Sequence, residues 1–380
     1  MKYYLIAGEA SGDLHARHLM ESIRRHDARS EIRYWYRPDL AYMGFVSVVM
    51  HPPQILRGMQ ECKADIAEFE PDRLILVDYP GFNLKIASWF YETYIAGRGS
   101  YATQKIVYYI PPKIWAWKEK RIVQIRNYVD TILSILPFEE DWYKERGVSK
   151  ICYVGNPTLD EISVFDSTLT EKEIKAWRGS LKLPPDSRVV ALMPGSRRQE
   201  IELNLPMMLR SAMKVGKGFC FVIASAPNID VSVYEKIIKA NVACSEMIRL
   251  APCDGSKSSF MLLRNAYAAM VTSGTATLET AIMRVPQVVC YAMRCAKFFS
   301  FLRKLFLRVP YVSLVNLIAG FEVVPELVAG DLSQERLDDV LGKLLADKES
   351  RQKQLDGYGC VIQKLGAAGA PDRAASIVTA

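Results

Sequence analysis

Short apolar runs alternate with helical patterns along the first half of the chain. The runs at residues 3–8, 73–78, 105–110, 131–136 and 151–155 are rich in β-branched and aromatic residues and are bounded by turn residues, so each predicts a short strand. Helical spacing of apolar residues follows Asp13 and recurs over residues 55–68 and 120–128. Strands that alternate with helices in this way predict a parallel, doubly wound sheet.

The alternation restarts after a polar stretch at residues 166–188. Apolar runs at residues 189–193, 219–224, 247–250, 268–272 and 287–291 predict a second set of strands. The predicted fold class is therefore α/β, with two Rossmann-like doubly wound domains that face a cleft. We place the N-terminal domain at residues 1–164 and the C-terminal domain at residues 165–349. The helical segment 350–380 is expected to pack back on the N-terminal domain.

Composition narrows the classes of protein. The chain has 380 residues and a net charge of +7, which suits a membrane surface, a phosphorylated substrate or nucleic acid. Nucleic acid is not expected as a partner, because the sequence lacks a compact basic block with interleaved aromatic residues. No apolar run reaches the length of about 18 residues that a membrane-spanning helix needs. His15 and His18 share a helix face without a third ligand nearby, so no metal site is predicted.

Two motifs follow predicted strands in the first half. In GEASGD, the small residues Ser11 and Gly12 allow a ligand to approach a helix N-terminus; alternatively, the motif is a tight turn in which Asp13 caps the helix. In DYPGFN, Asp78 ends a central strand. Its carboxylate either deprotonates a substrate hydroxyl or caps the next helix.

A proline-rich loop, PPKIWAWK, follows the strand at residues 105–110. Trp115 and Trp117 stand two residues apart in this loop. They either form a platform for a sugar or an acyl chain, or plug a hydrophobic space.

Two further motifs follow strands of the second half. In PGSRR, Gly195, Ser196 and Arg197 suit a diphosphate, or form a basic surface turn. In TSGTATLE, hydroxyls and backbone N–H groups at a helix start suit phosphate, while the single acid suits ribose hydroxyls; the alternative is a capped helix with a surface acid. The residues of this second motif are Ser273, Gly274, Thr275, Thr277 and Glu279.

Two apolar stretches with basic flanks stand apart from these motifs. Residues 43–59 and 296–308 have the composition of segments that lie on an anionic membrane, although a core helix or a dimer contact would also explain them. The residues that we expect at the membrane are Phe45, Val48, Ile55, Phe298, Phe301 and Phe306.

Taken in order, the motifs resemble one family, the lipid-A-disaccharide synthases. The matching segments are GEASGD, DYPGFN, PPKIWAWK, LPFEEDWY, YVGNP, LMPGSRRQEI, TSGTATLE, and YVSLVNLIAG with VVPEL, and they span nearly the whole chain. The resemblance implies a GT-B fold and an inverting transfer of 2,3-diacylglucosamine from its UDP form to 2,3-diacylglucosamine 1-phosphate. The implied products are the β-1′,6-linked disaccharide 1-phosphate and UDP.

The resemblance also implies roles for individual residues. Asp78 matches the family's strand-end aspartate and would be the general base, with Asp13 and Glu9 as the fallback. UDP would be held by Gly195, Ser196, Arg197, Ser273, Gly274, Thr275, Thr277, Glu279 and Asn316. The acceptor or its acyl chains would contact Ser11, Gly12, Asn83, Trp115 and Trp117. Neither a metal nor a cofactor is implied, since the UDP-sugar is a substrate.

Because both substrates carry acyl chains, the resemblance implies a cytoplasmic enzyme of a Gram-negative bacterium, attached peripherally to inner-membrane phospholipid. A homodimer is one option for its assembly. The chain departs from the family after Trp35, where a connection is short by roughly a dozen residues, a large change for one loop. Pro111 and Lys113 stand where the family usually has serine, and Gly81 where many members have a second aspartate.

Two other functions compete with this one. Another GT-B UDP-sugar transferase or a UDP-sugar epimerase would share the architecture, but the commonest epimerase site needs a histidine near the anomeric carbon, and no histidine follows His51. A non-catalytic membrane-surface protein that binds a nucleotide-sugar is the alternative from a different class.

Overall fold

The computed structural model describes residues 1–8, 10–37, 52–97, 103–116, 118–215, 218–242, 247–272, 274–292 and 310–380. Within them the chain forms two compact units. Unit 1 comprises Met1–Asp160 and Ala367–Ala380, and unit 2 comprises Glu161–Gly366. This division differs from the predicted return of residues 350–380 to the N-terminal domain. The helix α17 (Lys348–Leu365) belongs to unit 2, and only the final helix, α18 (Ala370–Thr379), belongs to unit 1.

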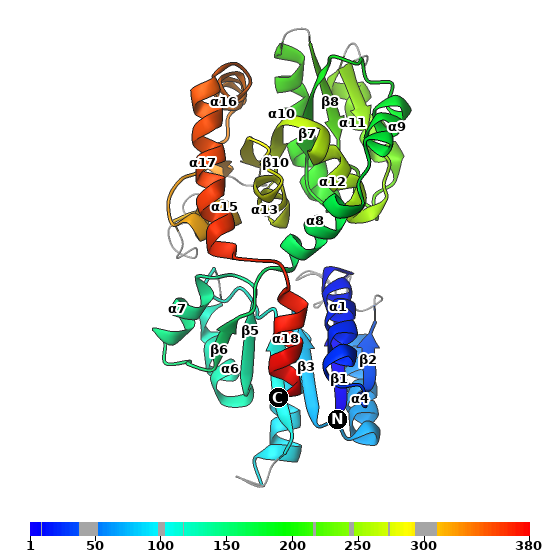
Figure 1. The fold of residues 1–380 in the computed structure, drawn as a ribbon, viewed down its shortest axis with the longest axis vertical. Coiled ribbons are helices and arrows are strands. Elements are labelled where there is room, and N and C mark those ends of the chain that lie inside the picture. The colour runs from blue at the N-terminus through cyan, green and yellow to red at the C-terminus, as the bar shows by residue number, and fades with distance from the viewer. Residues whose placement is uncertain are drawn as a thin grey trace. The chain divides into compact units, whose positions relative to one another are not determined.

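Unit 1 contains a parallel sheet with the strand order β2-β1-β3-β4-β5-β6 (Figure 1). The first five strands follow the flavodoxin-like order, in which the switch point lies between β1 and β3. The strands are β1 (Lys2–Ala7), β2 (Glu31–Tyr36), β3 (Arg73–Val77), β4 (Lys105–Tyr109), β5 (Thr131–Ser134) and β6 (Ile151–Tyr153). The helices are α1 (Ala10–His26), α4 (Pro52–Phe69), α5 (Pro80–Phe90), η1 (Tyr91–Ile95), η3 (Glu119–Arg121), α6 (Ile122–Tyr128), α7 (Glu139–Lys144) and α18.

Unit 2 contains a second parallel sheet, with the order β12-β11-β10-β7-β8-β9. Counted from β7, this is the Rossmann order 3-2-1-4-5-6, with the switch point between β7 and β10. The strands are β7 (Arg188–Met193), β8 (Phe219–Ile223), β9 (Ile248–Leu250), β10 (Ala266–Val271), β11 (Gln287–Tyr291) and β12 (Glu326–Val328). The helices are α8 (Pro157–Thr168), in which the unit boundary falls, α9 (Glu171–Ser180), α10 (Arg198–Lys214), α11 (Val231–Asn241), α12 (Gly255–Asn265), α13 (Thr275–Ile282), α15 (Leu314–Ala319), η5 (Ala329–Asp331), α16 (Gln334–Ala346) and α17.

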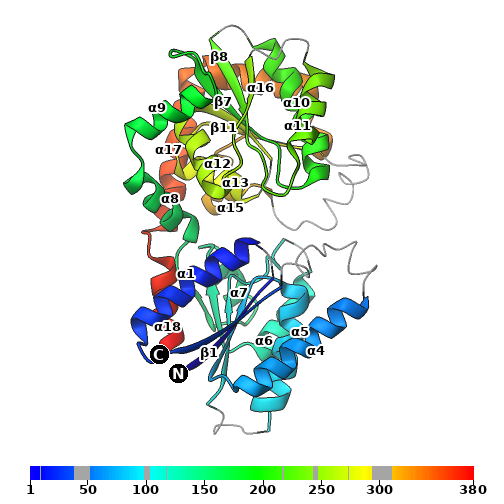
Figure 2. The same ribbon diagram turned by 90° about the vertical axis from the view of Figure 1, so that its right-hand side faces the viewer.

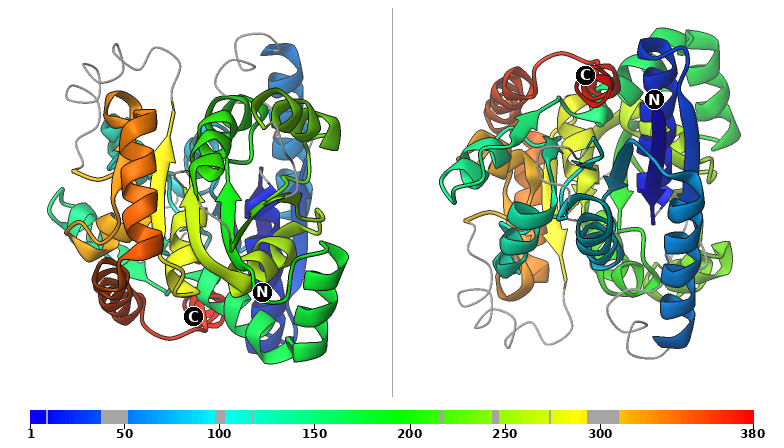
Figure 3. Two further views of the ribbon diagram at one scale, coloured as in Figure 1. Left: turned by 90° about the horizontal axis from the view of Figure 1, so that it is seen from above. Right: turned by 90° about the horizontal axis from the view of Figure 1, so that it is seen from below.

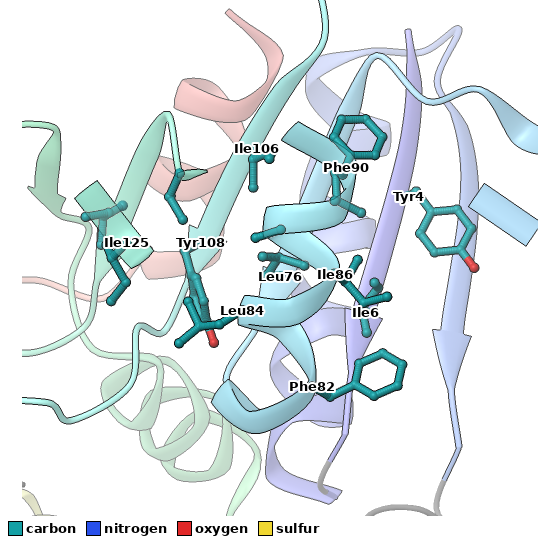
Figure 4. Packing of buried hydrophobic residues seen from close by; sticks show 14 of the residues in the cluster. Tyr4, Ile6, Leu76, Phe82, Leu84, Ile86, Phe90, Ile106, Tyr108 and Ile125 are labelled. Atoms are coloured by element: carbon teal, nitrogen blue, oxygen red, sulfur yellow. The ribbon is translucent and has the colours of Figure 1, made fainter. Parts of the chain in front are cut away.

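The strands of unit 1 bury both faces. Tyr4, Ile6 and Leu76 point to the face covered by α4, α5 and α6, where they pack against Phe82 and Phe90 (Figure 4). Their neighbours in sequence point to the opposite face, which α1 and α18 cover (Figure 2). Because α18 belongs to unit 1, both chain termini lie in this unit (Figure 3). A sheet covered on both faces is what the near-continuous apolar runs predict.

The prediction of two doubly wound α/β units is confirmed, but three elements were missed. β2 is a partly exposed edge strand and β12 has three residues, so neither produces a strong apolar run. The helix α9 lies inside the stretch that we took as merely polar. Its capping box, in which Thr170 and Glu173 bond each other's backbone N–H groups, is a sequence signal that would have revealed it.

The described residues hold no helix that combines the length and hydropathy required to cross a membrane.

Candidate functional site

The turns that follow β1 and β3 meet at the switch point of unit 1. The two strands are parallel neighbours, so both turns lie at the same edge of the sheet. A Cβ atom on Gly8 would overlap the ring of Tyr79, which means that the turns touch and that only glycine fits there. The structure thereby brings the GEASGD and DYPGFN motifs together. Glu9, predicted as a fallback base, lies outside the described residues.

Asp78 directly follows β3 in an unusual backbone conformation. Its φ angle is 48° and that of Tyr79 is 46°, so two consecutive non-glycine residues are left-handed. Such conformations cost free energy and persist only where the surroundings fix them. Here the Asp78 carbonyl accepts hydrogen bonds from the Tyr108 hydroxyl at 2.7 Å and from Nδ2 of Asn83 at 2.7 Å. The result is a partly exposed carboxylate on a rigidly held turn at the carboxyl end of a central strand.

Three residues of this turn pair were predicted to contact the acceptor. Ser11 is exposed and Gly12 is buried. Asn83 is fully buried, and its amide nitrogen donates to the carbonyl oxygens of Val77 and Asp78. Asn83 therefore stabilises the Asp78 turn from within the protein. Because its side chain is buried, it is not available to contact an acceptor, in contrast to its predicted role.

Asp13, the other fallback base, lies in the first turn of α1. Its Oδ1 atom accepts hydrogen bonds from the Tyr34 hydroxyl at 2.7 Å and from Nε of Arg17 at 2.9 Å. This carboxylate therefore ties α1 to β2.

Trp115 is buried, with 5% of its surface exposed. Its indole ring packs edge-on against Phe138 at 5.0 Å between centroids. Of the two interpretations of this loop, the structure favours the hydrophobic plug for Trp115 over a sugar platform. Trp117 lies outside the described residues.

Glu139, at the start of α7, is a buried acid to which no role was given. The Trp115 indole donates to its Oε1 atom at 2.8 Å, and the Ser134 hydroxyl donates to Oε2. Burial raises the pKa of Glu139 to about 7, while the bonds from Ser134 and Trp115 and the charge of Lys113 act to lower it. The only sequence signal was an acid inside the apolar segment LPFEE.

In unit 2, the PGSRR turn begins α10 next to the switch point. Gly195 has a φ angle of 114°, and a Cβ atom there would lie 2.6 Å from Oε2 of Glu200. This same oxygen accepts hydrogen bonds from the backbone N–H groups of Ser196 at 3.2 Å and Arg197 at 3.3 Å. The N–H groups that we predicted to bind diphosphate thus hold a carboxylate of the protein itself. The Arg197 side chain is 77% exposed and extends to solvent.

The TSGTATLE turn lies on the other side of this switch point, after β10. Gly274 has a φ angle of 131° and, like Thr275, is exposed, so both fit the predicted site. Thr277 is fully buried and its hydroxyl donates to the Gly274 carbonyl at 2.8 Å, so it closes the turn internally. Burial, and secondarily the nearby Glu161, raises the pKa of Glu279 to about 7. Ser273 lies outside the described residues.

Asn316, predicted to hold UDP, is fully buried in α15. Its Nδ2 atom donates to the Val324 carbonyl and to Oε1 of Glu326, each at 2.9 Å. Its Oδ1 atom accepts from the N–H groups of Val323 at 2.8 Å and Val324 at 3.0 Å. The amide is fully used in fixing the loop at residues 320–326, so the structure gives Asn316 a supporting position and no contact surface for UDP.

In the described part of the chain, no group of three or more His, Cys, Asp or Glu side chains is arranged so that it could hold a metal ion. The pKa of His15 is lowered to about 4, first by burial and then by His18, so His15 stays neutral at physiological pH.

Comparison with known proteins identifies the family. The model of the lipid-A-disaccharide synthetase family matches residues 3–377. The chain belongs to this family. A lipid-A-disaccharide synthase of Myxococcus xanthus is 33% identical over 393 residues, covering 98% of this chain and 96% of its own. The synthase of Nitrosococcus oceani is 33% identical over 383 residues, covering 96% and 92% respectively.

Solved structures with the same fold are more distant. UDP-GlcNAc 2-epimerase from Neisseria meningitidis, bound to UDP-GlcNAc, has a TM-score of 0.65 at 12% identity, covering all of this chain and 98% of its own. The Methanocaldococcus jannaschii UDP-GlcNAc 2-epimerase has a TM-score of 0.63 at 13% identity, with coverages of 100% and 99%. At such low sequence identities, the structural similarity shows the fold alone. Membership of the synthetase family, by contrast, confirms the predicted family and the predicted enzyme class, a glycosyltransferase of lipid A biosynthesis.

Proposed function

We propose that this enzyme transfers 2,3-diacylglucosamine from UDP-2,3-diacylglucosamine to the 6-hydroxyl of 2,3-diacylglucosamine 1-phosphate. The products are the β-1′,6-linked disaccharide 1-phosphate and UDP. The observation that carries the proposal is the Asp78 turn: an aspartate at the carboxyl end of a central strand, whose backbone carbonyl accepts two hydrogen bonds, beside the switch point where α/β sheets bind ligands.

Inversion requires a single in-line displacement. Asp78 takes the proton from the acceptor 6-hydroxyl, whose oxygen forms a bond to the anomeric carbon on the face opposite UDP. The bond from that carbon to the UDP oxygen breaks, and UDP keeps the electron pair. The restraint on the Asp78 backbone fixes the base, which limits the reorganisation that proton transfer would otherwise need.

The donor side is assigned to the two turns of unit 2. Arg197 extends its guanidinium to solvent and would neutralise the diphosphate, while Gly274 and Thr275 begin α13 and would offer N–H groups. Glu279 follows one turn later and would accept from the ribose hydroxyls. Because these cationic and N–H groups can supply the charge stabilisation, the reaction needs neither a metal nor a cofactor.

The acyl chains of both substrates support a place at the inner-membrane surface, on the cytoplasmic side. Of the residues predicted to contact lipid, Phe45, Val48, Phe298, Phe301 and Phe306 lie outside the described residues. Ile55 lies in the first turn of α4 and is partly exposed, and its neighbours Leu56 and Arg57 are exposed. Changing Phe298, Phe301 and Phe306 to serine should release the enzyme from sedimented membranes, and unchanged recovery would reject this membrane role.

The decisive experiment measures UDP release from the diacylated donor with and without the acceptor. A synthase releases UDP and forms disaccharide only when the acceptor is present. An epimerase changes the donor sugar without the acceptor, and a non-catalytic binding protein yields neither product. Either of the latter results would overturn the proposed function.

A further inference from the structure

Glu139 is a buried acid of unit 1 that the proposed reaction does not use. It is 1% exposed and begins α7, directly after the loop that leaves β5. No Lys, Arg or His among the described residues forms a salt bridge with it. Its two oxygens are instead met by hydrogen-bond donors from Trp115 and Ser134. A buried carboxyl group without a salt-bridge partner is costly, so its hydrogen-bond donors must offset that cost.

The bond from Trp115 connects Glu139 to the loop that follows β4. Ile110, the first residue after β4, is left-handed with a φ angle of 59°, so the chain turns sharply out of the strand. The loop then bonds within itself, from Ile114 N–H to the Pro112 carbonyl at 2.6 Å and from Ala116 N–H to the Lys113 carbonyl at 3.1 Å. The indole of Trp115 ties the loop to α7, because it hydrogen-bonds to Glu139, 24 residues later in the chain.

This loop stands next to the proposed base. β4 is the parallel neighbour of β3, so residues 111–116 leave the same edge of the sheet as Asp78. The Asp78 N–H group donates to the Tyr109 carbonyl at 3.3 Å, and the Tyr108 hydroxyl bonds to the Asp78 carbonyl. In the loop itself Lys113 is exposed, between the buried Pro112 and Ile114.

We propose that Glu139 is a positioning residue: through its hydrogen bond with the Trp115 indole it holds residues 111–116 in place and so shapes the side of the Asp78 turn where the acceptor binds. This proposal rests on the function proposed above. Glu139 is too deeply buried to touch a substrate, so it acts only through Trp115.

Three substitutions test the hydrogen bond from its two ends. Trp115→Phe keeps an aromatic ring but removes the indole N–H. Glu139→Gln keeps an acceptor for that N–H, and Glu139→Leu removes it. The matched control is Trp142→Phe, because Trp142 also lies in unit 1, on α7, but packs against Arg146 and does not contact Glu139 through a hydrogen bond.

Steady-state kinetics separate positioning from general stability. Trp115→Phe and Glu139→Leu should raise the KM for the acceptor by about tenfold, the scale of a lost positioned contact, with the donor KM and UDP affinity within about twofold of wild type. Glu139→Gln and Trp142→Phe should leave the acceptor KM within about twofold. Folded variants with an unchanged acceptor KM, or an equal loss for both substrates, would overturn the proposal.

Amide hydrogen exchange tests the same idea without turnover. The N–H groups of Ile114 and Ala116 should exchange at least about tenfold faster in Trp115→Phe than in wild type or Trp142→Phe, while those of β3 stay protected. Unchanged exchange would reject the positioning role. If wild-type enzyme formed no disaccharide, the proposed function would fail on that result, whereas exchange would still decide whether Glu139 fixes the loop.

The indole proton of Trp115 offers a check in wild-type protein, should the variants not fold. Because this proton is hydrogen-bonded to the Glu139 carboxyl group, its NMR chemical shift should change as that group titrates. The signal is assigned by its loss in Trp115→Phe or by selective labelling. The groups that face Glu139 are Lys113 on the loop, Ser134 on β5 and Tyr143 on α7. A Trp115 signal that stays fixed from pH 5 to 9, around the value of about 7 for Glu139, would contradict the hydrogen bond.

Discussion

The hydroxyl of Tyr108 donates a 2.7 Å hydrogen bond to the carbonyl of Asp78, from the strand next to the one that Asp78 ends. Asn83 donates to the same oxygen from the first turn of α5. The two donors hold a left-handed turn that an aspartate adopts only at a cost in free energy. A strained backbone at a strand end beside a switch point is characteristic of a residue whose exact position matters for function.

Asp78→Asn should lower kcat by about a thousandfold, which is the usual contribution of a general base. Asparagine suits this test better than alanine, because it tolerates the left-handed backbone of the turn. UDP affinity, measured by calorimetry, should stay within about twofold, since the donor groups lie in unit 2.

The paired variant for this test is Asp13→Asn, which should keep most of the activity because Asp13 is engaged with Tyr34 and Arg17. If Asp13→Asn were the inactive variant and Asp78→Asn turned over normally, the assignment of the base would move to Asp13.

Tyr108→Phe should destabilise the protein by about 1 kcal/mol and also lower kcat, because the Asp78 carbonyl loses one of its two donors. Tyr358→Phe is a control in unit 2, where the buried hydroxyl lies within hydrogen-bond distance of the Val285 carbonyl at 3.1 Å and of Oε1 of Gln354 at 2.9 Å. Chemical denaturation and steady-state kinetics give the two quantities. Equal kinetic effects in both variants would show that the Tyr108 bond has no special relation to catalysis.

Asn316→Ala should cost about 2–4 kcal/mol of stability, because four hydrogen bonds to the loop at residues 320–326 are lost and several buried groups stay unpaired. UDP affinity, determined below the unfolding temperature, should change little. A large loss of affinity at unchanged stability would restore the direct contact with UDP that was first predicted.

Glu200→Gln should tighten UDP binding by about fivefold, the equivalent of roughly 1 kcal/mol for one partly exposed charge. In the structure the Glu200 carboxylate accepts the N–H groups of Ser196 and Arg197, so it competes with a diphosphate for the same donors and repels it. Calorimetric titration with UDP measures the effect. Weaker binding in the variant would mean that Glu200 organises the turn for the ligand.

Stability should depend on pH through Glu139. Its pKa is raised from 4.5 to about 7 in the folded protein, so the folded state binds this proton more tightly than the unfolded state. The free energy of unfolding of wild type relative to Glu139→Gln should therefore fall as pH rises from 4.5 to about 7, and remain lower above that, by on the order of 3 kcal/mol. Urea denaturation across this range measures it. Glu140→Gln, at the neighbouring and more exposed position, keeps Glu139 and should therefore show the same fall as wild type.

The sequence determined the layout of the protein. Apolar runs bounded by turn residues predicted most strands of both sheets, because strands buried on both faces must be almost continuously apolar. Strands that bury few apolar side chains were not predicted, namely the edge strand β2 and the three-residue strand β12. The turn motifs after β1, β3, β7 and β10 were also visible, since glycine and small polar residues are required where a strand turns into a helix at a ligand site.

Only the tertiary structure decided what each polar side chain in those motifs does. Asn83, Thr277 and Asn316 looked like ligand contacts, yet each forms its side-chain hydrogen bonds with other groups of the protein, mostly backbone. Glu139 and Glu200 drew no attention in the sequence, yet each accepts the donors of a motif residue, Trp115 in one case and Arg197 in the other. The reason is physical: residue type fixes which bonds a side chain can form, while its partner depends on which segments folding brings within about 3 Å.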